Sequence, residues 1–529
     1  MTTRIPAAEP LPALLPEYEF RATGTARLVL VINTTSFVDD ADADAFRHLR
    51  GSEPFAATLR DLRPRPPFLP DAETARLEQD AYDLRIFRSR LRYNHFFPTY
   101  RVAWDSSMRE ALRAAGCDAE RWACWTVRAR LTRHGLAVIT LDRPIEDEPL
   151  IRCTEAMLEL PAHGGHGMQD QWTLGMTILR AFLEALDRRL VVRLPRGQRV
   201  IRFRTTERAM HSLRLDRYVV HWFRRITRDG ELMPTTALKR DYAQLIAAFM
   251  EGSLVECDGL RRFPEYAAEP ARALLARDVA TWEEELCLFT GESALIYSPL
   301  LGRGMAYVGG PMGLDAHAYT NYWAGIIRGV EHLVAFRSEV QQAERRTSTL
   351  LGRIPALTRA VNDGRLTAHE LAEIDHLAAG LSDIFDGLPE QRSMAISAAA
   401  FRADYVRRKF EVLMRELDVQ PTLDLVNTNV EQLSFFLSYY GDMRLQWEGQ
   451  RTNSLGLGLG AVVLFMAISS FLADTFNVLD RLFSPTQTER DQAIRNLVLA
   501  IVIGLVVAAC LVVVVRIAWK RRSRVREPV

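Results

Sequence analysis

The chain has 529 residues, which is too long for a single domain and suits two or three. Its net charge at pH 7 is only +1, and no basic stripe is interleaved with aromatic residues, so we expect no nucleic-acid partner. The six cysteines lack the close spacing of metal ligands, which is typical of reduced thiols in a cytosolic setting.

The N-terminal half predicts a flexible segment followed by a mixed α/β domain. Residues 1–25 begin with a stretch rich in proline and acid and have no apolar segment typical of a signal peptide. Residues 26–312 mix strand and helix signals, which predicts one cytoplasmic domain. Its first strand is expected at Arg27–Val38, a run of aliphatic and β-branched residues. Arg121–Asp142 predicts a β-hairpin that turns at Arg133-His134-Gly135.

The rest of this domain alternates between helices and short strands. We expect a loop between helices at Leu62–Pro70, which contains four prolines. Helices are expected at 148–160 and 171–186, and strands at 190–194, 199–203, 217–226 and 293–298. Between the two helices, His163-Gly-Gly-His166 has the spacing of two metal ligands but no third ligand nearby, so a polar loop is the better interpretation.

Residues 313–453 predict a helical region and stalk without strands. Tyr319–Leu351 and Ser393–Val419 have helical periodicity, and Gln420-Pro421 predicts a break or kink after them. Thr367–Phe385 is an acidic helix. Four of its carboxylates, which form two pairs at i, i+3 spacing, are candidates for a regulatory cation site or, as the preferred alternative, a solvated face: Glu370, Glu373, Asp383 and Asp386.

An apolar seam with steps of three and four residues precedes the C-terminal region. It consists of Leu423, Val426, Val430, Leu433, Leu437 and Tyr440. Two interpretations stay open: an amphipathic helix packed on the cytoplasmic core, or a coiled-coil stalk that joins copies of the chain.

The C-terminal region predicts a transmembrane hairpin over residues 454–515. Its two uncharged runs, 454–473 and 497–515, are each long enough for a helix of about 30 Å, the thickness of a bilayer core. The basic tail at 516–529 places both termini in the cytoplasm by the positive-inside rule. The predicted fold class is therefore an α+β membrane protein in a cell inner membrane, with two buried helices as the alternative to the spans.

This order of parts resembles the CorA-type family of magnesium and divalent-cation channels. The resemblance is closest from Tyr319 to the C-terminus, and it implies five subunits whose first spans line a pore. The family's Gly-Met-Asn signature is absent, and Phe471–Asn477 stands in its place.

Asp474 and Asn477, at the outer end of the first span, are therefore the candidate pore or ion-binding residues, with Ser469 and Ser470 as candidate pore-lining hydroxyls. Asp474 would form a ring of carboxylates in a symmetric oligomer, and a helix-end acid facing water is its alternative. Gly456 and Gly460 have the spacing of a helix-packing motif.

The leading hypothesis is a homo-oligomer, pentameric if it follows the family, that conducts divalent cations passively. It needs no cofactor beyond Mg²⁺ or a similar ion, which would be transported or regulatory. The alternative is a membrane-tethered sensor or scaffold whose α/β domain binds a ligand or partner. The sequence has no Gly-x-Ser-x-Gly, His-Glu-x-x-His or kinase motif, so we expect no enzyme. A membrane-bound enzyme whose site is not visible as a motif is the third and least favoured alternative.

Overall fold

The computed structural model describes residues 19–83, 97–158, 167–195, 197–204, 216–257, 260–299, 316–362, 372–375, 377–378, 380–381, 404–447 and 494. The chain divides into two compact units, Met1–Leu433 and Ser434–Val529. The sheets and both hydrophobic cores lie in the first unit. In the second unit, the structure describes the end of one helix, 434–447, and Ile494.

The strands of the main sheet are β1 (Phe20–Asn33), β2 (Phe68–Pro70), β3 (Tyr100–Val102), β4 (Thr126–Leu131), β5 (Leu136–Pro149), β8 (Asp216–Arg228), β9 (Glu231–Leu232), β12 (Leu286–Phe289) and β13 (Ser293–Tyr297). Their order is β12-β13-β8-β1-β5-β4-β3-β2, with β9 paired to β8. β13 is parallel to β8, and the other neighbouring pairs are antiparallel. Two smaller antiparallel pairs are β6 (Arg189–Leu194) with β7 (Gly197–Arg202), and β10 (Val255–Cys257) with β11 (Leu260–Arg262).

The helices among the described residues are α2 (Asp40–Leu49), α3 (Glu53–Arg60), α4 (Ala72–Asp83), α6 (Ser106–Ala114), α7 (Ala119–Ala123), α8 (Leu150–Leu158), α9 (Gly167–Ala185), α11 (Thr235–Asp241), α12 (Ala243–Glu251), α13 (Ala268–Leu275), α15 (Ala316–Asn362), α17 (Asp404–Glu416) and α18 (Val419–Trp447), with a short 3₁₀ helix η1 (Thr34–Phe37) after β1.

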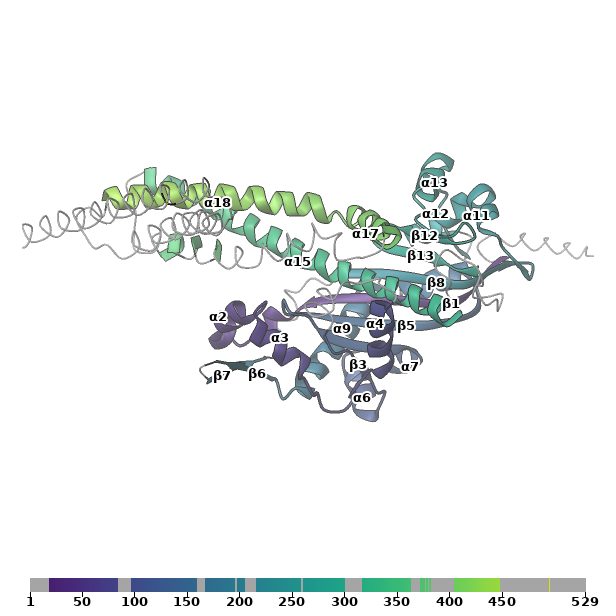
Figure 1. Ribbon diagram of the computed structural model, residues 1–529, viewed down its shortest axis with the longest axis horizontal. Coiled ribbons are helices and arrows are strands. Elements are labelled where there is room, and N and C mark those ends of the chain that lie inside the picture. Colours follow the sequence, from purple (N-terminus) through teal and green to yellow (C-terminus); the bar gives the residue numbers. More distant parts are fainter. Residues whose placement is uncertain are drawn as a thin grey trace, which may run out of the picture. The chain divides into compact units, whose positions relative to one another are not determined.

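Helices cover both faces of the main sheet, so each face has its own core. Leu28 and Leu30 of β1 belong to one core, together with α8, α9 and α12. Val29 and Val31 alternate with them and belong to the other core, with α15 and α17. Figure 1 shows α15 along one side of the sheet and α9, α6 and α7 on the other. A strand buried on both faces needs apolar residues at successive positions, as the aliphatic run of β1 provides.

Several predicted elements are confirmed. The strand predicted at Arg27–Val38 is β1, although it begins earlier and ends at Asn33, whose side chain accepts a hydrogen bond from the Thr35 amide at 2.9 Å and starts η1. The hairpin predicted at Arg121–Asp142 is β4 with β5. Its turn places Gly135 at φ +76°, a conformation that glycine adopts without strain. The predicted strands at 190–194 and 199–203 pair as β6 and β7.

Other elements differ from the prediction. The loop predicted at Leu62–Pro70 contains β2, an edge strand that pairs with β3. The break predicted at Gln420-Pro421 falls earlier, where Asp418 takes φ +51° between α17 and α18. Pro421 instead lies in the first turn of α18. The backbone N–H groups of a first turn have no partner within the helix, so proline costs no hydrogen bond there.

The predicted transmembrane hairpin is corrected. Within the ranges that the structure describes, no helix is both long and apolar enough to cross a membrane. α15 and α18 have 47 and 29 residues, but both carry charged side chains along their lengths. The predicted spans, 454–473 and 497–515, and the tail at 516–529 lie outside the described ranges. We therefore withdraw the membrane fold class, the inner-membrane location and metal-ion transport, and retain a mixed α/β fold with long helices.

The predicted seam of α18 forms one buried face of that helix. Its six residues are all buried in a single chain: Leu423, Val426, Val430, Leu433, Leu437 and Tyr440. Leu423 belongs to the core that contains α15, and Asn429 donates hydrogen bonds to Thr347 and Ser348 of α15 at 3.1 and 3.3 Å. The part of the seam in the first unit thus packs within the chain, as the amphipathic-helix interpretation expects. Association of copies stays a prediction.

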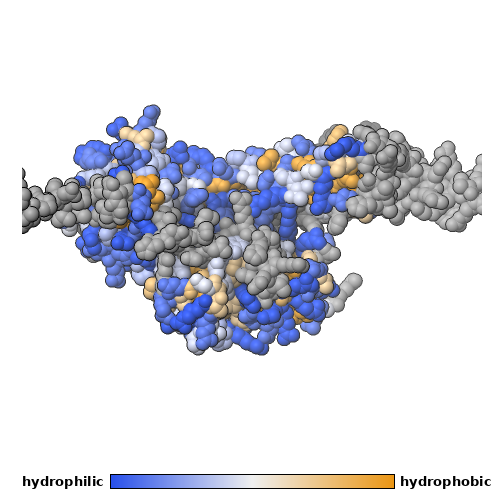
Figure 2. Space-filling model, turned by 180° about the vertical axis from the view of Figure 1, so that it is seen from behind, coloured by the Kyte–Doolittle hydropathy of each residue, from blue (hydrophilic) through white to orange (hydrophobic). Residues whose placement is uncertain are grey.

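The described surface is mainly hydrophilic. On the face shown in Figure 2, hydrophobic residues form small separate patches. Among the large apolar side chains in the described ranges, Phe435 on α18 has the highest exposed fraction, 77%. Scattered exposed apolar residues are normal for folded domains and need no special explanation.

Candidate functional site

The predicted pore and packing residues lie outside the described ranges, as do His163, His166 and three of the four acidic-helix residues. These are Asp474, Asn477, Ser469, Ser470, Gly456, Gly460, Glu370, Asp383 and Asp386. Glu373 is described, and its carboxylate pairs with Arg353 at 2.8 Å. Across the described ranges, no group of three or more histidine, cysteine or acidic side chains could hold a metal ion. Because three of its four carboxylates lie outside those ranges, the regulatory cation at the acidic helix stays a prediction.

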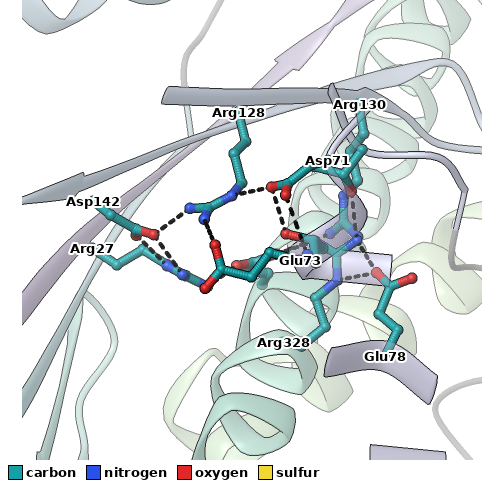
Figure 3. Close-up of polar contacts among 11 residues, drawn as sticks. Arg27, Asp71, Glu73, Glu78, Arg128, Arg130, Asp142 and Arg328 are labelled. Atoms are coloured by element: carbon teal, nitrogen blue, oxygen red, sulfur yellow. Dashed lines mark hydrogen bonds and ion pairs between the residues drawn. The ribbon is translucent and has the colours of Figure 1, made fainter. Parts of the chain in front are cut away.

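A layer of charged side chains lies between the main sheet and α15 (Figure 3). Arg128 and Arg130 of β4 alternate with Val127 and Ala129, whose side chains face the opposite core. Arg27 of β1 alternates with Leu28 and Leu30 in the same way. The pleat of the strands therefore places three arginines on the face that α15 covers.

Carboxylates from three elements pair with these arginines. Asp142 of β5 is the cross-strand partner of Arg27 and accepts from its Nη2 at 2.7 Å. Arg128 bridges Asp142 to Asp71, which also accepts from the Thr74 hydroxyl at 2.8 Å in the first turn of α4. Figure 3 shows these side chains in one connected row, which joins β1, β4, β5 and α4.

Helix α15 completes the layer through Arg328 and Glu331. Arg328 donates to Glu78 of α4 at 2.7 Å and to the Thr99 hydroxyl at 3.0 Å. Glu331 is 1% exposed, and its two oxygens accept from Arg27 and Arg328, each at 2.5 Å. Burial opposes the charge of Glu331, but Arg328, Arg27 and Arg130 outweigh it and lower its pKa to about 2.

This layer ties α4 and α15 to the sheet through paired charges, in addition to the apolar contacts that α15 makes with β1 and β8. Charged hydrogen bonds are directional, so the layer specifies the register of α15 against β1 and β4. Its net contribution to stability is small, because the desolvation of each ion offsets the attraction between ions. The arrangement holds the scaffold in one geometry.

A second buried pair lies where α15 and α17 cover the sheet near β12. Glu285 accepts a hydrogen bond from Trp323 Nε1 at 3.1 Å, and Lys409 donates to the Thr281 hydroxyl at 2.8 Å. Burial raises the pKa of Glu285 to about 8, against the opposing effects of Trp323 and Lys409. Burial likewise lowers the pKa of Lys409. Neither side chain lines the cleft described next, so we interpret this pair as part of the scaffold.

An open, basic cleft lies between α3, the segment after it, and β6. Its volume is about 370 Å³. Four arginines, Arg63, Arg65, Arg189 and Arg193, line it with two aspartates, Asp61 and Asp187. The lining therefore carries two positive charges in excess. The remaining wall is formed by small and apolar residues of α3 and by Leu190, Val191 and Gln198 of the β6–β7 pair.

Local structure explains how the arginines converge on this cleft, which we name the arginine cleft. α3 packs on β6, and the Arg65 amide donates to the carbonyl of Ala185 at the end of α9. On β6, alternation turns Leu190 into the core and leaves Arg189 and Arg193 exposed.

Asp187 is the internal partner of these cations. Its carboxylate pairs with both terminal nitrogens of Arg65 at 2.8 and 3.0 Å, and Arg189 lies 3.9 Å away. The backbone of Arg193 pairs with β7, but its guanidinium has no ion pair or hydrogen bond to another described residue. The cleft thus offers one free guanidinium and two that share a single, partly exposed carboxylate.

The backbone beside the cleft is held in an uncommon conformation. Asp187 and Arg188 have φ values of +56° and +54°, in the left-handed region that few non-glycine residues adopt. Consecutive residues of this kind cost free energy, and such strain is concentrated at functional sites. Here it turns the chain sharply from α9 into β6, and it places the carboxylate of Asp187 in front of Arg65.

The sequence carries a signal for this cleft, although no known motif contains it. Arg63 and Arg65 alternate with prolines, and Arg189 and Arg193 share one face of a strand. Each segment alone is typical of a solvated surface. Only the packing of α3 on β6 shows that the two pairs of arginines face one space.

Comparison with protein-family models, curated proteins and solved structures finds no match to this chain. The geometry of the described residues therefore carries the functional argument. The resemblance to CorA-type channels stays a prediction of the sequence.

Proposed function

We propose that the protein is a sensor or scaffold module whose α/β domain binds a small anionic molecule in the arginine cleft. The observation that carries this proposal is the convergence of four arginines on one cavity of about 370 Å³. That volume falls within the range of about 300–1,000 Å³ typical of small-molecule sites.

The charges favour a phosphate or carboxylate ligand. A guanidinium presents planar pairs of N–H donors that match the oxygens of a phosphate or carboxylate group. Arg193 is available for such a group, and Arg189 is only weakly engaged by Asp187 at 3.9 Å. The apolar wall at Leu190 and Val191 contacts the uncharged remainder of the ligand. A phosphorylated metabolite of moderate size meets both requirements.

Asp187 acts as a built-in competitor in the empty site. Its carboxylate occupies the donors of Arg65 that a ligand oxygen would use. Binding then exchanges this exposed ion pair for a pair with the ligand. Exposed ion pairs are worth at most about 1 kcal/mol, so the exchange lowers affinity only modestly.

Calorimetry of the full chain with inorganic phosphate, a nucleoside monophosphate, a sugar phosphate and a dicarboxylate tests the proposal. At least one of these probes is expected to bind, and the affinity is expected to fall tenfold or more in Arg193→Gln and Arg189→Gln. Arg272→Gln is the matched control, because Arg272 is an exposed arginine of α13 that does not line the cleft. Absence of binding by every probe, or equal binding by all three variants, contradicts the proposal.

A further inference from the structure

Two buried histidines lie on the two sides of the contact between α15 and the turn that joins β4 to β5. His134 belongs to the turn, and His332 belongs to α15 and is 7% exposed. Both imidazoles line one enclosed space of about 10 Å³, together with Phe336 and Glu339 of α15. The fold therefore places a titratable ring on each side of this contact.

The space between the rings is too small to hydrate a charged imidazole. Its volume is close to the minimum of about 10–15 Å³ that one water molecule requires. Glu339 lies 4.0 Å from Nε2 of His134, beyond normal hydrogen-bond distance, so it compensates a proton on that ring only in part. A buried charge without full compensation is costly, so an imidazolium here favours a rearrangement that lets water reach it.

The arginines around the two rings add to this cost. Glu331 lies 3.6 Å from Arg130 but also accepts from Arg27 and Arg328, so its carboxylate is already engaged. A proton on either ring is therefore opposed by nearby guanidinium groups. The charged groups close to the rings are Arg130 of β4, Arg133 of the turn, Arg50 after α2, and Arg328, Glu331 and Glu339 of α15.

These surroundings keep both rings neutral at pH 7. Burial, with smaller effects of Arg133 and Arg50, lowers the pKa of His134 from 6.5 to about 4. Burial, followed by Arg130 and Arg328, lowers the pKa of His332 to about 3. A solvated ring binds a proton more tightly than a ring in the closed contact. The contact is therefore fully stable above about pH 6.5 and loses stability as the pH falls from 6.5 toward 4.

We propose that His134 and His332 form an acid-sensitive latch between the β4–β5 turn and α15. The latch is closed while both rings are neutral, and a proton on either ring opens it by drawing water between the turn and the helix. Ion pairs of Arg328 with Glu78 at 2.7 Å and of Arg337 with Asp216 at 3.0 Å hold α15 to α4 and β8. The turn thus separates from a helix that stays on the sheet.

Labelling of a buried cysteine measures the opening of this latch. Ala335 lines the enclosed space and is 3% exposed, so Ala335→Cys places a thiol that reacts only when the contact opens. A disulfide reagent that reacts in mild acid, with mass spectrometry, gives its labelling rate relative to that of the exposed Cys124. Between pH 7 and pH 5 this ratio is expected to rise about twentyfold for each ring that opening exposes.

Histidine variants in this background locate the response. His134→Gln and His332→Gln should each make the rise about twentyfold smaller, since each removes one proton-binding ring. His221→Gln is the matched control and should leave the rise unchanged, because His221 is a buried histidine of β8 that packs against Phe249 on the opposite face of the sheet. An equal reduction by His221→Gln indicates acid unfolding of the whole domain and overturns the latch, as does a labelling ratio that stays constant from pH 7 to pH 5.

Hydroxyl-radical footprinting of the unmodified chain tests the latch without depending on the folding of a variant. Phe336, 2% exposed beside the histidines, should be oxidised faster at pH 5 than at pH 7, whereas Phe249, 1% exposed, should stay protected. Protection of both residues at pH 5, or equal oxidation of both, overturns the proposal. The latch shares no residue with the arginine cleft, so the two proposals fail separately.

Discussion

Substitution of Glu285 by glutamine tests whether this buried carboxyl is protonated in the folded protein. Glutamine keeps the shape of the side chain and its acceptor for Trp323 Nε1, but it cannot ionise. Burial raises the pKa of Glu285 from its ordinary value of 4.5 to about 8, despite the bond from Trp323 and the charge of Lys409. The folded wild-type protein therefore holds a proton that the unfolded chain releases between these two pH values.

The sign and size of the effect follow from this difference. A raised carboxyl pKa means that the folded state binds the proton more tightly, so wild-type stability declines as pH rises from about 4.5 to about 8. The pKa difference of about 3.5, at about 1.36 kcal/mol for each pKa unit, amounts to roughly 5 kcal/mol above pH 8. Glu285→Gln lacks this decline and should exceed the wild type by up to that amount.

Urea unfolding followed by tryptophan fluorescence between pH 5 and pH 9 measures the difference. The two proteins should be nearly equal at pH 5, and the variant should be the more stable at pH 9. Glu284→Gln is the matched control, because Glu284 is the exposed neighbour of Glu285 in sequence. Parallel stability curves for wild type and Glu285→Gln across this range would show that Glu285 is ionised in the folded state, and would refute the reasoning.

Three further predictions concern other parts of the chain. Asp187→Asn should tighten anion binding in the arginine cleft about fivefold, because it removes the exposed ion pair that occupies Arg65, and asparagine tolerates a positive φ. Calorimetry with the probe that binds most tightly measures the change, and weaker binding argues against competition by Asp187. Glu331→Gln should destabilise the protein by about 3–5 kcal/mol at pH 7, because Arg27 and Arg328 lose the buried carboxylate that they share. The difference from the wild type should shrink as the pH falls from 4.5 toward 2, where the wild-type carboxylate becomes protonated. Urea unfolding measures both effects, and a stability difference that does not change with pH contradicts the prediction. Gly135→Ala should lower the melting temperature, because φ is +76° and the new Cβ would lie 2.7 Å from Cζ of Phe46; an unchanged melting temperature shows that the turn relaxes.

The sequence predicts the strands of this fold well where their pattern is local. The alternation from Trp125 to Leu131 and the turn at Gly135 indicate the β4–β5 hairpin without further information. The sequence does not indicate the edge strand β2 or its neighbour β3, because three residues give too little pattern and Pro70 ends β2.

The charged layer cannot be predicted from the pattern within any one segment of the sequence. Alternation shows that Arg128 and Arg130 share one face of β4, but it does not show what covers that face. The partners Arg328 and Glu331 follow about 200 residues later on α15. Periodicity within one element carries no information on contacts at such separations, and those contacts decide whether an arginine is solvated or buried.

The functional residues also depended on tertiary contacts. The candidates from the sequence were motifs within single segments, such as Asp474 with Asn477, and most of them lie outside the described ranges. The arginine cleft instead joins Arg63 and Arg65 to Arg189 and Arg193, more than 120 positions away. The membrane prediction rested on the length of two apolar runs and on the basic tail after them. The long helices in the described ranges are instead charged along their length.

The most direct test of the central claim is a crystal structure of the full chain in inorganic phosphate. The account predicts a phosphate in the arginine cleft with hydrogen bonds to Arg189 and Arg193, and with the ion pair between Arg65 and Asp187 opened. A cleft that holds only water at saturating phosphate, with that ion pair intact, contradicts the account.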